Sequence, residues 1–135
     1  MRNYIIHIFV IGALLSGQMA GQQVDHDCDK STLSQNEINR CTDLKVDESE
    51  KNLNSIYKDL LQEIKDDELL VRQVVGAERS WLSFRDEFIQ AAYPASGPHS
   101  DNGSMLPAQR GELQIQLTQE HIQHLLLLKI FFSDR

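Results

Sequence analysis

The helical character of this chain is clearest in residues 71–92, which read VRQVVGAERSWLSFRDEFIQAA. Within this stretch one set of residues recurs at spacings of three and four, the period of an α-helix that buries one side. The pattern stops at Tyr93-Pro94, because proline disfavours helix in the residue that precedes it. We therefore predict a long amphipathic helix whose inward face consists of Val71, Val74, Val75, Glu78, Trp81, Leu82, Arg85, Phe88, Ile89 and Ala92.

A second helix is predicted upstream of this one. Ser34 followed by Glu37 matches a capping box, in which each side chain accepts a hydrogen bond from the other residue's backbone amide. The helix continues to about Lys65, and the acidic residues 66–68 then form a short connection whose charge suits the start of the next helix. The predicted inward face of this helix is Glu50, Leu53, Asn54, Tyr57, Leu60, Leu61 and Ile64.

A third helix is predicted from Ala108 to Phe132, after a long polar loop over residues 94–107 that holds all three prolines. Its last turns, residues 125–132, are apolar on almost every side, so they are either buried on several sides or used as a contact surface. The predicted fold is all-α, a small bundle with a long antiparallel helical hairpin plus a third C-terminal helix. The inward face of the third helix is Leu113, Leu117, His121, Leu125 and Leu128.

Two charged residues, Glu78 and Arg85, fall on the predicted inward face and need partners, because a buried unpaired charge is costly. If the first two helices form a hairpin that turns near Asp66, Asn54 and Glu78 are equidistant from the turn and face each other. Glu50 and Arg85 differ by about 4.5 Å along the axis, which a long Arg side chain can span. We therefore predict a Glu50–Arg85 ion pair between helices, with a structural rather than a catalytic role.

Length and charge limit the class of protein. The chain has 135 residues, enough for one domain, and its formal net charge is −7. No basic cluster is present to follow a phosphate backbone, so we expect no nucleic-acid partner.

The first twenty residues have the pattern of a secretory signal peptide. Arg2 precedes an apolar run from Ile5 to Leu15, which is too short to span a bilayer, and small or polar residues follow up to Ala20. We predict a signal peptide over residues 1–20, a mature domain over residues 21–135 and a periplasmic or secreted protein. The sequence resembles a lipobox at residues 15–18 but lacks its cysteine, so no stable membrane anchor is expected after cleavage.

The chain contains two cysteines, Cys28 and Cys41. Export places them in an oxidising compartment, so a disulfide is the default prediction. The alternative is a metal site formed by these thiols and the acids beside Cys28, but the two residues lack the paired spacing of zinc ligands. We predict no metal and no cofactor.

Several of these segments resemble one family. Residues 77–86, AERSWLSFRD, look like its pattern Ala-Gln-Arg-x-Trp-x-x-Tyr-Arg-Asp, and residues 50–57 look like its acid, Leu-Asn and Tyr positions downstream of a cysteine. The family is the lysozyme inhibitor LprI-like N-terminal domain, a group of small exported bacterial proteins, and the resemblance covers about residues 28–128. The motif positions in this chain are Glu50, Leu53, Asn54, Tyr57, Glu78, Arg79, Trp81, Arg85 and Asp86.

The chain also departs from the family pattern. Two positions where relatives often carry cysteine are Phe88 and Leu113, as though a second disulfide had been replaced by an apolar packing contact. A usual arginine and a frequent acid of the last helix fall on His121 and His124. These two histidines could share a metal with an outside acid, but such a pair is more often one core and one surface residue.

The resemblance implies inhibition of a cell-wall lysozyme, possible partners being a c-type lysozyme or another cell-wall hydrolase. No nucleophile motif, phosphate loop or paired carboxylates are found, so we predict that the protein is not an enzyme. The alternative is an interaction or immunity-type protein whose apolar C-terminal helix docks on another envelope protein or on its own copy as a homo-oligomer. The candidate target-binding residues lie in the polar loop: Ser96, His99, Ser100, Asp101 and Ser104.

Overall fold

A computed structural model describes Cys28, residues 31–94, Ser96 and residues 103–133. These residues form three helices: α1 (Gln35–Glu63), α2 (Glu68–Ala92) and α3 (Leu106–Ser133). The predicted all-α fold is confirmed, and the predicted helix ends differ from the observed ones by only two residues or so. The predicted signal peptide lies outside the described residues.

Local sequence signals account for where each helix begins and ends. At the start of α1 the predicted capping box is present, with the Ser34 and Glu37 side chains each accepting from the other residue's backbone amide. At the start of α2 the Asp67 carboxylate accepts from the Leu70 amide. That helix ends at Ala92, with Tyr93 as its C-cap directly before Pro94, as predicted.

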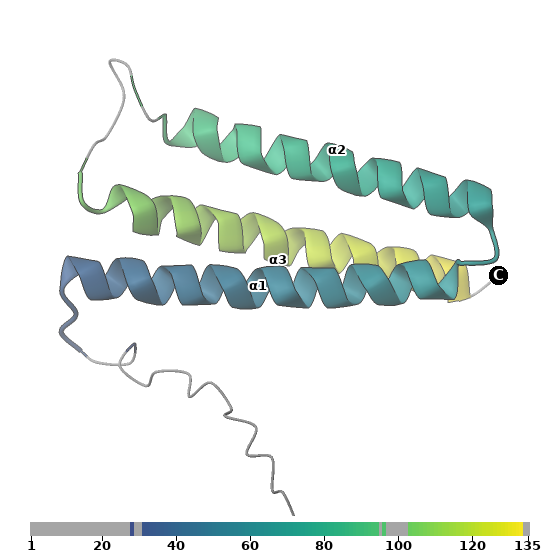
Figure 1. The fold of residues 1–135 in the computed structure, drawn as a ribbon, viewed down its shortest axis with the longest axis horizontal. Coiled ribbons are helices and arrows are strands. Elements are labelled where there is room, and N and C mark those ends of the chain that lie inside the picture. The colour runs from purple at the N-terminus through teal and green to yellow at the C-terminus, as the bar shows by residue number, and fades with distance from the viewer. Residues whose placement is uncertain (1–27, 29–30, 95, 97–102, 134–135) are drawn as a thin grey trace, which may run out of the picture.

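The three helices alternate in direction (Figure 1), with α2 antiparallel to both α1 and α3. The parallel pair α1 and α3 is tied at both ends: the Asn39 amide donates to the Ser104 carbonyl at 3.2 Å, and the Ser133 hydroxyl donates to Glu63. The most extensive packing in the bundle joins α1 to α3. The α1–α2 hairpin is present, but it is not the main packing unit.

The core lies along the line where α1 and α3 meet and continues to α2. Five buried residues of α3 are separated by three, four or seven positions, the spacing of side chains that interlock between two nearly parallel helices: Ala108, Gly111, Thr118, Ile122 and Leu125. The apolar centre is Leu53, Leu60, Ile64, Val74, Ile122 and Leu125.

Gly111 lets α1 and α3 approach closely. A Cβ atom at this position would overlap the Cγ2 methyl of Thr42 and would lie 3.4 Å from a methyl of Val46. Thr42 is buried and β-branched, so its methyl has little freedom to turn away. The glycine is therefore required by the spacing of the two helices.

We predict that Gly111→Ala lowers the free energy of unfolding by about 1–2 kcal/mol, because overpacking outweighs the gain in helix propensity. The matched control is Gly76→Ala on α2, where an added Cβ meets nothing within 4 Å. That change should raise stability by about 0.5–1 kcal/mol. Urea unfolding measures the stability of both variants. Equal changes of the same sign in the free energy of unfolding would show that the α1–α3 contact does not require a glycine at position 111.

Candidate functional site

The family-like segment of α2 places two charged side chains in the interior. Glu78 is 7% exposed and Arg85 is 8% exposed, as predicted. The Arg85 Nη1 donates to Glu50 Oε1 at 2.5 Å, which confirms the predicted ion pair between α1 and α2. The guanidinium also binds Asp86 Oδ1 at 2.9 Å, and Gln114 Nε2 of α3 donates to Glu50 Oε1 at 3.0 Å. Arg85 and Glu50 thus connect all three helices.

The predicted partner of Glu78 was wrong. Asn54 is exposed, and the Glu78 carboxylate instead lies 2.7 Å from His121 Nε2 on α3. This hydrogen bond joins α2 to α3 in the interior of the bundle. The partner of Glu78 thus comes from α3, which is not part of the α1–α2 hairpin.

An aromatic stack joins the two polar pairs. The Trp81 indole and the His121 imidazole are stacked, with ring centroids 3.8 Å apart and planes inclined by 6°. The Arg85 Cζ lies 5.1 Å from the Trp81 ring centroid, in range for a cation–π contact. We call the connected set of Glu50, Glu78, Trp81, Arg85, Gln114 and His121 the polar layer.

The polar layer is organised to hold the helices in register. Its charges are paired and its rings are stacked, and Glu78, Arg85 and His121 are largely closed to solvent. A buried network of this kind favours one arrangement of a bundle over alternatives. Sequence reasoning missed Gln114 and His121 as members, because their polar partners lie 43 to 64 residues away in the chain.

Tyr57 of α1 lies beside the polar layer. Burial raises the pKa of its phenol above the usual value of about 10, and the charge of Glu78 adds to the rise while that of Arg79 opposes it. The neutral phenol therefore contributes stability that is present below about pH 10 and is lost as the pH rises through the folded-state pKa.

We predict that the wild type loses stability above about pH 10 more steeply than Tyr57→Phe does, because the unfolded chain releases the phenol proton at lower pH than the folded one. Urea unfolding at a series of alkaline pH values measures the two slopes. Parallel slopes would show that the folded and unfolded phenols titrate alike.

The cysteines are bonded to each other. Cys28 and Cys41 form the predicted disulfide, with Cα atoms 5.7 Å apart, and the bond ties the segment before α1 to the buried side of that helix. Because both sulfur atoms are in the disulfide, neither cysteine can serve as a thiolate ligand of a metal ion. Across the described residues no group of three or more His, Cys, Asp or Glu side chains is placed to hold a metal ion.

Other predicted residues are placed as follows. His121 is buried and His124 is exposed, as expected for one core and one surface histidine. Phe88, predicted to face inward, is 45% exposed, so it does not replace a second disulfide by core packing. Of the candidate loop residues, Ser96 and Ser104 are exposed, whereas His99, Ser100 and Asp101 lie outside the described residues.

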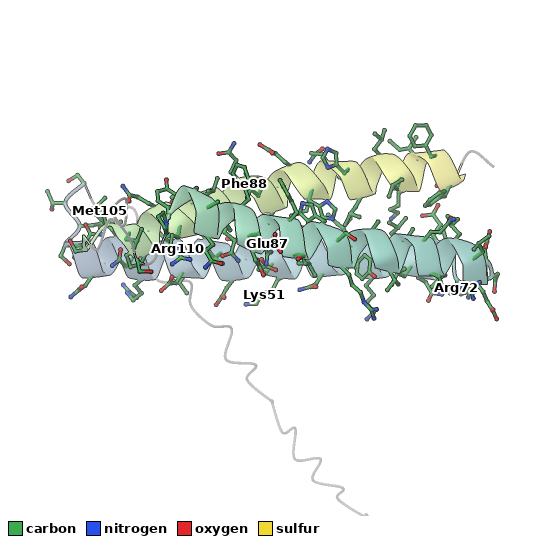
Figure 2. All side chains as sticks on the ribbon, turned by 90° about the horizontal axis from the view of Figure 1, so that it is seen from above. Lys51, Arg72, Glu87, Phe88, Met105 and Arg110 are labelled. Atoms are coloured by element: carbon green, nitrogen blue, oxygen red, sulfur yellow. A yellow bond between two sulfur atoms is a disulfide. The ribbon has the colours of Figure 1, made fainter. Side chains whose placement is uncertain are left out.

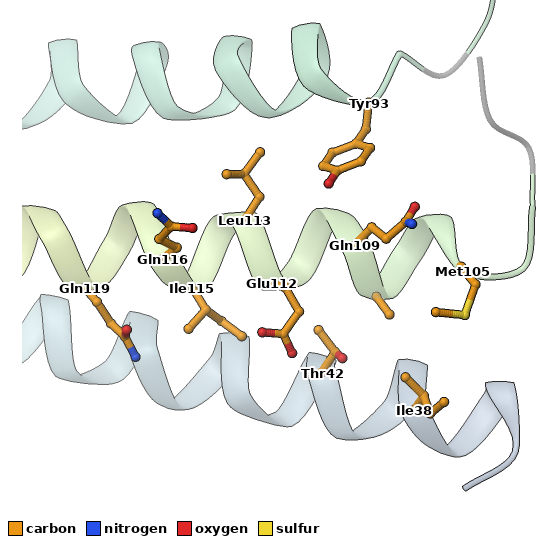
Figure 3. Close-up of a pocket in the computed structure, with 11 residues that line it drawn as sticks. Ile38, Thr42, Tyr93, Met105, Gln109, Glu112, Leu113, Ile115, Gln116 and Gln119 are labelled. Carbon is orange, nitrogen blue, oxygen red and sulfur yellow. The ribbon is translucent and has the colours of Figure 1, made fainter. Parts of the chain in front are cut away.

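An open groove of about 500 Å³ lies where the start of α3 approaches α1 and the end of α2 (Figure 3). Apolar side chains such as Ile38 and Leu113 share its lining with the Tyr93 ring and three glutamine amides. Its residues come from three separate segments, so no single sequence motif could predict it.

Comparison with known families decides the assignment. The family model described as lysozyme inhibitor LprI matches residues 28–125, which include the disulfide and the whole polar layer. The chain belongs to the LprI lysozyme inhibitor family. No curated protein and no solved structure matches this chain.

Membership of the LprI family bears on the predictions about enzymatic activity and about the partner. The family is one of inhibitors rather than enzymes, and its description implies a lysozyme as partner. Among the helices described, none is long and apolar enough to cross a membrane.

Proposed function

We propose that this protein is exported to the periplasm or secreted, where it binds and inhibits a cell-wall lysozyme. The observation that carries the proposal is the family match over residues 28–125. The signal-like sequence of residues 1–20 and the disulfide are both consistent with an oxidising compartment outside the cytoplasm.

Inhibition of this kind needs a stable surface rather than reactive groups. A net charge of −7 attracts a basic enzyme such as a c-type lysozyme and speeds encounter, but charge alone gives weak, salt-sensitive association. A specific contact must therefore add to it. The polar loop that contains Ser96 and Ser104 joins two long helices and is a candidate to enter the substrate cleft.

We expect the wild type to inhibit lysozyme hydrolysis of purified cell wall at about 0.15 M salt, where charges are screened beyond about 8 Å. Replacing residues 96–104 with a Gly-Ser linker of equal length should abolish inhibition, and circular dichroism of the variant should still show the three helices folded. If both proteins inhibit equally, the loop is not the inhibitory element. If the wild type fails to inhibit several c-type lysozymes, the proposed function is wrong.

A second candidate function rests on the end of α3. Leu127, Ile130 and Phe131 are all half-exposed or more, which is unusual for one helical segment of a soluble monomer. Such a segment suits an interaction or immunity-type protein that docks on another envelope protein. Capture of a periplasmic protein by the wild type but not by Ile130→Asp, together with absence of lysozyme inhibition, would favour this function.

A further inference from the structure

An aromatic pair lies exposed in the middle of the bundle, on the second half of α2. Phe84 is 54% exposed and Phe88 is 45% exposed, and their ring centroids are 5.6 Å apart. Both rings are therefore in contact with each other while much of their surface faces solvent. Phenylalanine is normally among the most buried residue types, and it is enriched at the centres of protein interfaces.

The pair is located on the side of α2 that is turned towards α3. Trp81 stacks on His121 of α3, and Phe84 and Phe88 follow Trp81 by three and seven positions, so they continue the same side of the helix. Figure 2 shows Phe88 projecting on this side of the ribbon. The rings therefore form one side of a surface that α2 and α3 share.

Acidic side chains border the pair. Glu87 lies between the two phenylalanines in sequence, is exposed, and accepts a hydrogen bond from the Ser83 hydroxyl at 3.0 Å. On α3 the exposed Glu120 directly precedes His121 and accepts from Gln116 Nε2 at 3.0 Å. Since Trp81 and His121 are in contact, Glu120 lies within about one helical turn of Phe84 along the bundle axis. We call Phe84, Phe88, Glu87 and Glu120 the aromatic face.

The negative charge of the aromatic face determines which kind of partner can bind there. Two copies that paired through it about a twofold axis would bring the same carboxylates together, on a chain that already carries −7. A basic partner would instead place cations against the carboxylates while apolar groups cover the rings. This is the arrangement of a specific interface, with an aromatic centre and a charged rim that steers association.

We infer that the aromatic face is the surface on which a basic lysozyme docks. The inference rests on the proposed function and specifies where the inhibitor holds the enzyme. The rings supply affinity at the centre, and Glu87 and Glu120 accept from lysine or arginine side chains of the enzyme. The polar layer beneath, through Trp81 and His121, fixes the two helices that carry these residues.

The test compares two pairs of exposed apolar residues. Phe84→Ala/Phe88→Ala removes the rings, and Leu44→Ala/Leu69→Ala, whose side chains are 41% and 60% exposed, removes apolar surface on α1 and at the start of α2. Titration calorimetry with a basic c-type lysozyme at about 0.15 M salt measures Kd. We expect the first variant to bind at least about tenfold more weakly and the control within about twofold of wild type.

A charge variant tests the rim. Glu87→Gln/Glu120→Gln should lower the association rate at low salt and reduce its dependence on salt concentration, because fewer charges steer the encounter. Circular dichroism and thermal melts check that every variant is folded at the temperature of the binding measurement.

Three results would overturn the inference. If the wild type inhibits and the phenylalanine variant inhibits equally, the enzyme docks elsewhere and the proposed function stands. If the wild type binds no lysozyme, the inference about the aromatic face and the proposed function are both wrong. If sedimentation shows a wild-type dimer that the phenylalanine variant loses, the occupant is a second copy of the chain.

Discussion

Replacing Arg85 with alanine is expected to lower the free energy of unfolding by about 2–4 kcal/mol. The substitution removes the cation beside the Trp81 ring and takes from Glu50 its counter-charge, while the hydrogen bond from Gln114 is kept. A carboxylate that loses its partly buried counter-charge keeps its desolvation cost without the compensating attraction. The polar layer would therefore lose stability in the region where all three helices meet.

Thermal and urea unfolding measure the effect, with Arg79→Ala as the matched control on the exposed side of the same helix. The control should stay within about 0.5 kcal/mol of wild type. Adding Glu50→Gln to Arg85→Ala should recover part of the loss, because the unpaired charge is removed. A melting temperature within about one degree of wild type for Arg85→Ala would mean that the ion pair adds no net stability.

Removing the disulfide by Cys28→Ser/Cys41→Ser is expected to lower the free energy of unfolding by about 3 kcal/mol. The bond closes a loop with a sequence separation of 13, which restricts the unfolded chain, and it also anchors the segment before α1. Cys41 is buried, so the serine hydroxyl that replaces it must find a hydrogen-bond partner there.

The measurement is urea unfolding of wild type and the double variant, each with and without a reducing agent. Reductant should destabilise the wild type to the level of the variant and leave the variant unchanged. Two reactive thiols in denatured, naturally exported protein would contradict the pairing. An unchanged midpoint on reduction would show that the bond does not contribute to stability.

Much of the secondary structure follows from local sequence. The capping box at Ser34, the acidic Asp67 cap and Pro94 each act within a few residues, so the helix ends could be predicted without knowledge of the packing. The Glu50–Arg85 pair was also predictable, because the short turn limits the axial offset between the two residues to a distance that a long Arg side chain spans. The disulfide followed from having two cysteines and an export signal.

The tertiary structure decided which helix each buried face packs against, which the periodicity of the sequence does not determine. A helical stripe shows which side is buried but not against which helix, and α1 packs most extensively on α3 because Gly111 permits close approach. That packing brings His121 to Glu78 and leaves Asn54 in solvent. It also leaves Phe84 and Phe88 at the margin of the α2–α3 contact, half-exposed although they are apolar. Contacts between residues far apart in sequence depend on how three helices fill space together, and no local signal encodes that geometry.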